Sequence, residues 1–430
     1  MDVEDRIRVE EFRQLKKEVR GSQEHLIVGI DVAKDKHHAF FGTANGKTLL
    51  KRLVFENNAE GFNKLLTFLE AVKVKHGLDK EVVALEPTAN YHKPLGEHLI
   101  KRGHSVVLVS GNAVKNNREL LNGRWDKNDT KDPANIADLV SQGKFLYYDY
   151  PVLPLRDLRN LLSLKRRLKK QEHGLKVRIR NHLLAQYFPE YDRYYGQCEA
   201  VDFSVVRWSL APCAIAGLEY DEFVRLVAPG TRSTTGQREH LRAIWEKAAR
   251  SIGCEVGVSM GFEAKMMVEG LERLRDAIGM SDDKIKEICL HFPEYSYIIT
   301  IPGFGPDISS KVLAAIGNPF RFDTGKQVVK MAGYDLSAKR SGKRSETIVP
   351  VISKRGKADL RYALYQAAHV ASSKNQYFVM YFTNKLRGRE KEKGIKTKMK
   401  VKLAAKLLVI AWTLMKKEEP YNPDYLNLDE

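Results

Sequence analysis

Short hydrophobic runs, rich in β-branched residues and bounded by polar ones, recur near the start of the chain, as β-strands require. The pattern predicts strands over residues 25–31, 37–44 and 49–56. Asn45-Gly46 supplies the two-residue turn between the second strand and the third. The chain is therefore expected to begin its fold with an antiparallel meander.

Helical and strand-like patterns alternate in the next eighty residues. They predict a helix over 59–75, a strand over 81–86, a helix over 94–102 and a strand over 105–110. A last helix is predicted to begin at Pro133. The order βββαβαβα indicates a mixed α/β domain in which helices join parallel strands.

The middle of the chain is expected to form a helical arm. Residues 155–186 predict one long helix, with Leu161, Leu168 and Leu175 at the seven-residue spacing of a coiled coil. Helical patterns over 238–252 and 262–289 are placed to return antiparallel to it. The arm is thus expected to pair within the chain or to dimerise.

Four acidic residues stand where these predicted strands end or a helix begins: Asp31, Glu86, Asp129 and Asp132. A buried carboxylate needs a compensating cation or hydrogen bonds, because an unpaired charge is costly to remove from water. Mg²⁺ and similar hard cations prefer oxygen ligands and can clamp the oxygens of a phosphoryl transfer. The acids therefore predict a site for Mg²⁺ or Mn²⁺.

Each acid also has an interpretation without chemistry. Asp31 can start a turn, and Glu86 can be a surface residue before Pro87. Asp132 directly precedes Pro133 and can be an ordinary helix N-cap. As a group, however, the acids and the element order resemble the ribonuclease H-like fold of RuvC-type nucleases, whose metal sites fall at these places.

Composition adds a polyanionic partner to this picture. Lys and Arg number 72 against 54 Asp and Glu, which gives a formal net charge of +18 and favours nucleic acid. No signal peptide and no run of about 18 apolar residues is found, so a cytoplasmic protein without a membrane partner is expected, associated with the nucleoid when active. The longest apolar run, 407–415, predicts a buried helix. The four scattered cysteines are expected to be reduced core residues.

Three segments are candidates for binding nucleic acid. Residues 298–306 resemble the hairpin of a helix-hairpin-helix module, in which glycines and helix N-terminal amides contact phosphate. Basic residues also gather in the arm, in a loop over 331–344 and in a turn over 351–361. Solvated charge, a tight Pro-Gly turn and nonspecific backbone binding are the alternative interpretations. The candidate residues are Gly303, Gly305, Lys343, Arg344, Lys354, Arg355, Lys165, Arg166, Arg167, Lys169 and Lys170.

These motifs together resemble the DEDD transposases of the "IS one-ten" insertion-sequence family, guide-RNA-directed serine recombinases that join a RuvC-like domain to a transposase domain. The resemblance rests, in order, on residues 29–34, 85–88, 127–132 and 352–356. It implies a RuvC-like DEDD domain over 22–150 and a coiled-coil arm with an insertion over 151–294. A mainly α transposase domain over 295–420 follows, with a helix-hairpin-helix-like segment, a serine loop and a basic tail.

The resemblance also implies roles for individual residues. The four acids carry over as metal-binding and catalytic residues, although Pro133 stands where an alanine is common in the family. The family's nucleophilic serine precedes a glycine in the basic loop, which points to Ser341, with Ser337 as the rival. No His adjoins this loop, so the metal site must activate the hydroxyl if the two domains meet. Lys343, Arg344 and Arg355 are placed to stabilise transition-state charge.

The expected partners are element and target DNA, a structured guide RNA and further copies of the chain in a dimer or tetramer. Two other functions stay open. In a RuvC-like nuclease, the acids activate water and the serine is structural. In a noncatalytic nucleic-acid-binding relic, the basic surfaces persist without chemistry.

Overall fold

The computed structural model describes residues 3–122, 131–228, 234–337 and 351–425. The chain divides into two compact units. Unit 1 comprises Met1–Val152 and Gly317–Gln327, and unit 2 comprises Leu153–Ile316 and Val328–Glu430. The division into three domains over 22–150, 151–294 and 295–420 stays a prediction.

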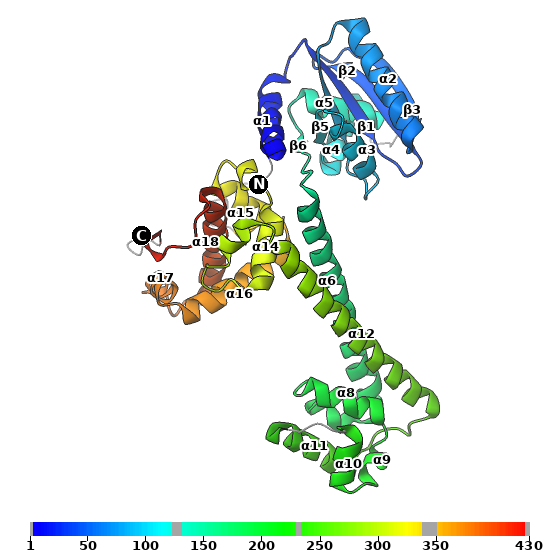
Figure 1. The fold of residues 1–430 in the computed structure, drawn as a ribbon, viewed down its shortest axis with the longest axis vertical. Helices are drawn as coiled ribbons and strands as arrows, with labels where there is room; N and C mark the ends of the chain where they lie inside the picture. The colour runs from blue at the N-terminus through cyan, green and yellow to red at the C-terminus, as the bar shows by residue number, and fades with distance from the viewer. Residues whose placement is uncertain (1–2, 123–130, 229–233, 338–350, 426–430) are drawn as a thin grey trace, which may run out of the picture. The chain divides into compact units, whose positions relative to one another are not determined.

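Unit 1 contains a six-stranded mixed sheet, which confirms the predicted α/β domain (Figure 1). The strand order is β3-β2-β1-β4-β5-β6. The first three strands pair antiparallel, as the meander predicted, and β1, β4 and β5 run parallel. The strands are β1 (His25–Asp31), β2 (Lys36–Thr43), β3 (Thr48–Glu56), β4 (Lys80–Leu85), β5 (Val106–Leu108) and β6 (Leu146–Tyr147).

Helices cover both faces of this sheet, so each face has its own core. Apolar side chains of α2 (Ala59–His76) and α3 (His92–Ile100) pack on the face formed by Leu26, Val28 and Ile30. On the opposite face, α1 (Val3–Glu18), α4 (Gly111–Asn122) and α5 (Lys131–Ser141) cover Ile27, Val82 and Ala84. Alternate residues of the central strands therefore serve different cores.

Helices α1 and α4 and strand β6 of unit 1 were not predicted from the sequence. Helix α5 also begins at Lys131, two residues before Pro133. Proline is tolerated there because the first turn of a helix leaves its amides without intrahelical partners. Asp132 thus lies within the first turn and not at the cap.

A short segment from late in the chain belongs to unit 1 because α1 binds it. The buried Asn318 side chain donates to Asp5 at 2.7 Å. Arg13 donates to the Phe320 carbonyl at 2.9 Å, and the Arg6 guanidinium stacks over the Phe320 ring. Residues 317–327 are therefore held by polar and cation–π contacts to residues some three hundred positions earlier.

Unit 2 contains the predicted long helices. Helix α6 (Leu153–Arg178) continues through a π-helical stretch, Ile179–Leu184, into α7 (Ala185–Tyr187), and it packs along α12 (Val258–Cys289) (Figure 1). The chain between α7 and α12 forms a helical insertion with its own hydrophobic core. Its helices are α8 (Glu199–Trp208), α9 (Pro212–Ala216), α10 (Tyr220–Val227) and α11 (Thr235–Ala248).

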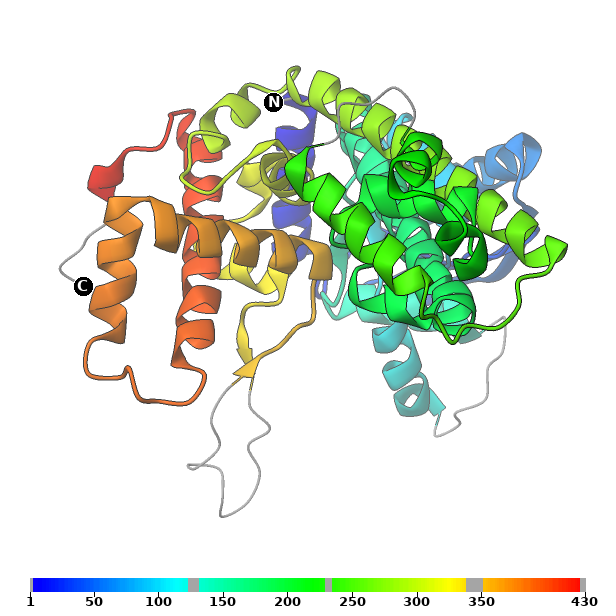
Figure 2. The same cartoon turned by 90° about the horizontal axis from the view of Figure 1, so that it is seen from below.

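The C-terminal part of unit 2 is mainly helical, as predicted. Helices α16 (Ala358–Lys374), α17 (Gln376–Leu386) and α18 (Ile395–Lys417) pack against one another (Figure 2). The apolar run 407–415 forms a largely buried part of α18, which confirms the prediction. This part also contains α13 (Pro293–Ile298), α14 (Pro306–Ile316), β7 (Leu336–Ser337), β8 (Val351–Ile352) and the end of α15 (Gly325–Ala332), whose first three residues belong to unit 1.

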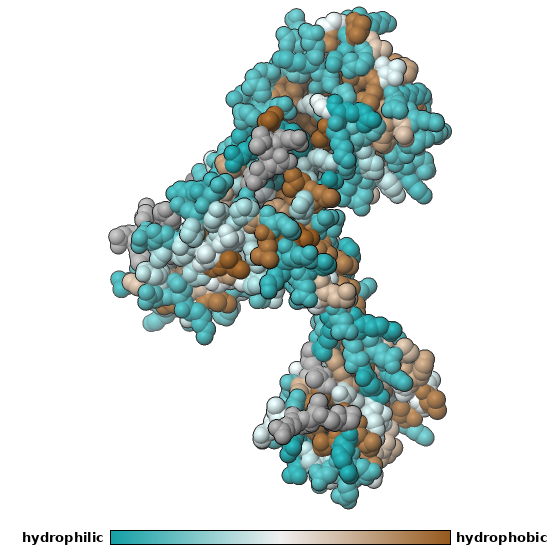
Figure 3. Space-filling view, viewed as in Figure 1, coloured by the Kyte–Doolittle hydropathy of each residue, from teal (hydrophilic) through white to brown (hydrophobic). Residues whose placement is uncertain are grey.

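Two features of the surface bear on the sequence predictions. Hydrophilic side chains cover most of the face drawn in Figure 3, and no helix in the described ranges is long and apolar enough to cross a membrane. The cysteines are free, as expected, but only Cys289 is buried. Cys213 and Cys254 are exposed, so the prediction of core cysteines was wrong for those two.

Candidate functional site

Two of the predicted acids stand at the ends of neighbouring parallel strands. Asp31 is the last residue of β1, and Glu86 directly follows β4. Ile30 lies opposite Leu85, and the Glu86 amide donates to the Ile30 carbonyl at 3.3 Å. The strand pairing therefore extends to the acids and places them next to each other.

Side-chain alternation assigns both acids to the same face of the sheet. Residues two apart on a strand share a face, so Asp31 lies on the face of Ile27, and Glu86 on that of Val82 and Ala84. This is the face covered by α4 and α5. The Glu86 Oε1 approaches Gly111, the first residue of α4, so closely that a Cβ there would lie 2.7 Å from it.

Gly29 allows α5 to approach this face. A Cβ at Gly29 would lie 2.1 Å from the Pro133 carbonyl oxygen and 2.7 Å from the Ala137 amide nitrogen. Asp132 precedes Pro133, and it is only 1% exposed. The structure thus brings Asp132 to the sheet face that carries Asp31 and Glu86, while Asp129 lies outside the described residues.

An arginine that the sequence did not single out binds the Asp132 carboxylate. Arg118 of α4 donates through Nε to Oδ1 at 2.9 Å and through Nη2 to Oδ2 at 3.0 Å. Such bidentate pairs are among the stronger hydrogen-bonded contacts in proteins. In the part of the chain that the structure describes, no three His, Cys, Asp or Glu side chains form a group with metal-site geometry.

The donor set is nevertheless the kind that a hard divalent cation prefers. Asp31 and Glu86 are half-buried carboxylates on adjacent strand ends, and carboxylate oxygens suit Mg²⁺ and Mn²⁺. Asp132 fits the same role only when Arg118 releases it, because both of its oxygens accept from the guanidinium. Asp31 and Glu86 would therefore hold the ion in either case.

His38 is a neighbour of this site that sequence reasoning missed. It pairs with Asp31 across β1 and β2. The adjacent His37 packs on Phe55 and Phe62 at the other face, so His38 shares the face of Asp31. Its Nδ1 is buried without a hydrogen-bond partner in the described residues. The sequence alone does not show whether His37 or His38 lies opposite Asp31, because that depends on the register between β1 and β2.

The basic loop that carries the predicted serine emerges from a short hairpin stem. Ser337 in β7 pairs with Val351 in β8, and Leu336 pairs with Ile352. At the base of the stem, the Ser353 hydroxyl donates to Asp335 at 2.5 Å and the Ser353 amide donates to the Asp335 carbonyl. Ser341, Lys343 and Arg344 lie outside the described residues.

The turn after this stem is held by close backbone packing. A Cβ at Gly356 would lie 2.5 Å from the Met331 carbonyl oxygen, and the Arg361 guanidinium donates to the Ala332 carbonyl at 2.9 Å. Lys354 adopts a left-handed backbone with φ of 55°, which is strained for a residue with a side chain. Lys354 and Arg355 are exposed beside the stem.

The basic run in the arm divides into two kinds of residue. Lys165 is buried and bonds Asp307 at 2.7 Å, with Asp282 as a second partner. It joins α6 to α12 and α14, and its ammonium is enclosed by these partners. The other four side chains are exposed: Arg166, Arg167, Lys169 and Lys170. Of these, Arg166 pairs with Asp359 at 3.0 Å.

The predicted helix-hairpin-helix segment is packed into unit 2. A Cβ at Gly303 would lie 2.4 Å from the Ala367 carbonyl oxygen, so this glycine serves a close contact with α16. Asp307 lies in the first turn of α14 and binds Lys165 and Lys311. A carboxylate therefore already stands at the helix N-terminus where a phosphate was expected, whereas the space around Gly305 is open.

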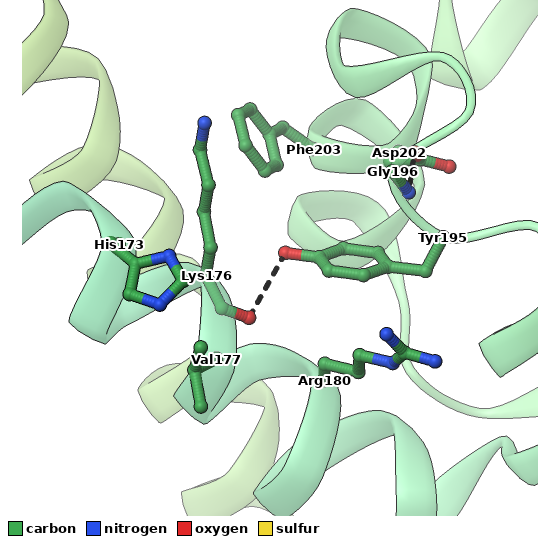
Figure 4. Close-up of a pocket in the computed structure, with 8 residues that line it drawn as sticks. All are labelled: His173, Lys176, Val177, Arg180, Tyr195, Gly196, Asp202 and Phe203. Atoms are coloured by element: carbon green, nitrogen blue, oxygen red, sulfur yellow. Dashed lines mark hydrogen bonds between the residues drawn. The ribbon is translucent and has the colours of Figure 1, made fainter. Parts of the chain in front are cut away.

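A separate cavity of about 190 Å³ lies between α6 and the helical insertion (Figure 4). Its cationic side chains have internal partners, since Lys176 pairs with Glu172 and Arg180 with Asp192. The buried Asp202 accepts from Tyr191 and His240. Lys176, Arg180 and Asp202 of this lining are thus all engaged by other residues of the chain.

Comparison with known proteins assigns both halves of the chain. Residues 28–189 match a family model described as "Transposase", and residues 295–383 match one described as "Transposase IS116/IS110/IS902 family". A sheet with paired carboxylates, joined to a helical C-terminal part, is thus the framework of a transposase, an enzyme that moves DNA. The chain belongs to the IS110 family of insertion-sequence transposases.

Curated relatives agree with this membership. The "Insertion element IS116 uncharacterized 44.8 kDa protein" of Streptomyces clavuligerus is 24% identical over 93% of this chain and 97% of its own length. The "Pilin gene-inverting protein" of Moraxella lacunata is 22% identical over 92% and 97%. The "Putative transposase y4uE" of Sinorhizobium fredii (strain NBRC 101917 / NGR234) is 27% identical over 39% of this chain and 46% of its own length.

Proposed function

We propose that this transposase cuts and rejoins the DNA of its own insertion element, with Mg²⁺ or Mn²⁺ at the acids and Ser341 as nucleophile. A structured noncoding RNA directs target choice, and the protein acts as a dimer or tetramer. The observation that carries the metal-dependent part is the position of Asp31 and Glu86, adjacent and on one face at the ends of parallel strands.

The chemistry assigned to these residues is a phosphoryl transfer. A bound divalent cation supplies charge stabilisation at a phosphate oxygen and favours loss of the attacking hydroxyl's proton. Ser341 Oγ forms a bond to phosphorus while the bond from phosphorus to one deoxyribose oxygen breaks, and that oxygen takes up a proton. Rejoining reverses these changes with another strand end, so the number of phosphodiester bonds is conserved.

Several observations support this assignment. A relative whose name describes gene inversion fits strand rejoining, because inversion requires both cutting and joining. The net charge of +18 favours DNA and RNA as partners. Lys354 and Arg355 are exposed beside the hairpin stem, and Arg166, Arg167, Lys169 and Lys170 are exposed on the arm. We assign these six to phosphate contacts.

Detection of a covalent protein–DNA adduct tests the nucleophile. Purified protein, element DNA, its flanking noncoding RNA and Mg²⁺ are combined and separated on a denaturing gel. Wild type and Ser337→Ala should form the adduct, and Ser341→Ala should not. Asp31→Asn should lose it as well, because the acids support the same step. An adduct that persists in Ser341→Ala would reject this serine.

The nuclease with metal-activated water is the second candidate. The paired acids favour it as much as they favour the recombinase, since they suit either attacking oxygen. It predicts free cleaved DNA and no adduct in any sample, with activity lost in Asp31→Asn and kept in Ser341→Ala.

A further inference from the structure

Arg118 binds a carboxylate, that of Asp132, which is expected to be a metal ligand. Its guanidinium takes both oxygens of Asp132 at 2.9 and 3.0 Å, and the Asp132 side chain is almost fully buried. A carboxylate removed from water in this way requires a cation at all times, because an uncompensated buried charge strongly destabilises the fold.

We propose that Arg118 is an exchangeable internal counterion, which holds Asp132 in the metal-free protein and releases it when a divalent cation binds. This inference rests on the proposed metal site. One cation replaces another, so Asp132 is compensated before, during and after the exchange. Arg118 is in this view a positioning residue that sets how readily Asp132 becomes a ligand.

The contact between α4 and α5 allows this exchange without disruption of either helix. The buried Asn117 side chain donates to Asn135 and to Asp138, both at 2.7 Å. Asn135 in turn donates to the Val114 carbonyl at 2.7 Å. These hydrogen bonds hold the two helices against each other without any contribution from Arg118.

The arginine side chain also has a route away from the carboxylate. The Arg118 side chain keeps 17% of its surface exposed, against 2% for Asp132. Its long, flexible stem can turn the guanidinium toward water while the Asn117 contacts stay in place. A released guanidinium next to the acids is also suited to contact a DNA phosphate, because arginine binds phosphate in a bidentate manner.

If Arg118 and the metal compete for Asp132, removal of Arg118 should increase the affinity for Mg²⁺. Calorimetric titration with Mg²⁺, after removal of metal by chelator, should show Arg118→Ala binding about tenfold or more tightly than wild type, since two charge-assisted hydrogen bonds no longer have to be displaced. Without metal, Arg118→Ala should unfold at a lower temperature than wild type. Mg²⁺ should raise its unfolding temperature by more than it raises that of wild type.

Two further variants separate this exchange from a general change in charge. Arg118→Lys keeps the charge but loses the fork, so its affinity should be intermediate, and it serves as the folded substitute if Arg118→Ala does not fold. In the Asp132→Asn background, Arg118→Ala should bring no gain, because the gain passes through Asp132.

An unchanged or weaker Mg²⁺ affinity in Arg118→Ala, with Asp31-dependent binding intact, would overturn the exchange, because Arg118 would then support Asp132 as a ligand. Binding in Arg118→Ala alone, with none in wild type, would support it. If neither wild type nor any Arg118 variant shows Mg²⁺ binding that Asp31→Asn removes, the metal site itself is rejected, and the proposed function fails with it.

Discussion

A single added methyl group at Gly29 should damage the site more than its size suggests. In Gly29→Ala, the new Cβ would lie 2.1 Å from the Pro133 carbonyl oxygen and 2.7 Å from the Ala137 amide nitrogen. Both atoms belong to the backbone of α5, so no side-chain rotation relieves the contact. To restore an ordinary separation of about 3.4 Å, α5 must retreat by about 1.3 Å, the difference from 2.1 Å.

The displacement of α5 should lower the free energy of unfolding by an amount that can be estimated to order of magnitude. Ile136, Leu139 and Val140 of α5 are buried in the core on this face, and a shift of that size opens gaps around each of them. Overpacking of a core costs about 1–3 kcal/mol, and a clash with backbone belongs at the upper end. For a unit of this size, about 3 kcal/mol corresponds to a fall in Tm of about 6–12 °C.

Scanning calorimetry is the suitable assay, because three of the four tryptophans, Trp208, Trp245 and Trp412, lie in unit 2, so tryptophan fluorescence would report mainly on that unit. The transition of unit 1 should move down, and DNA cleavage should fall with it as Asp132 moves away from β1. Gly174→Ala is the matched control, since nothing lies within 4 Å of a Cβ on this exposed helical residue. Alanine there should be neutral or stabilising by up to about 1 kcal/mol. Unchanged unfolding of Gly29→Ala would refute the packing argument.

Three other changes test separate parts of the structure. Lys165→Met should destabilise unit 2 by about 1–3 kcal/mol in urea unfolding, because it leaves two half-exposed aspartates short of a partner. The salt dependence of its DNA binding should equal that of wild type. Lys169→Gln, in contrast, should reduce the slope of log affinity against log salt concentration by about 0.9 per lost phosphate contact. Gly356→Ala should abolish adduct formation and leave DNA binding largely intact, because a Cβ 2.5 Å from the Met331 carbonyl oxygen displaces the hairpin base; full activity would contradict this. Burial lowers the pKa of His37, whose Nδ1 accepts from the Ala33 amide. Stability should therefore be fully present above the unfolded-state pKa of about 6.5 and fall as pH drops from there through the folded pKa. His37→Asn should lose less of its urea midpoint between about pH 7.5 and 5.5, and an equal loss would exclude this residue as a source.

The central strands were predictable because each is a nearly continuous apolar run with clear ends. Strand β1 matched its prediction, and β4 did so within one residue. Helix α4 was missed for the opposite reason. Val114 is its single buried hydrophobic residue in the described part, and Asn117 and Arg118 make its polar contacts with α5. A polar interface of this kind leaves no hydrophobic periodicity to detect.

The same limit applies to the candidate site. Asp31 and Glu86 could be placed together because strand ends are visible in the sequence and parallel strands end at one edge. Arg118 could not be found, because its partner is fourteen residues away across a helix that was itself not predicted. The addition of residues 317–327 to unit 1 depends on contacts with α1 that span some three hundred positions. One sequence contains no direct record of such pairings.

Lys165 illustrates why a basic run cannot be interpreted residue by residue from charge alone. The buried residues of α6 include Leu155, Leu158 and Lys165, and Lys165 follows Leu158 by seven residues, or two helical turns. Lys165 therefore occupies the position where the heptad pattern calls for an apolar side chain. Arg167 and Lys170 lie on the other side of the helix from this stripe and are exposed. The helical period thus separates the one cation that holds unit 2 together from cations that face solvent.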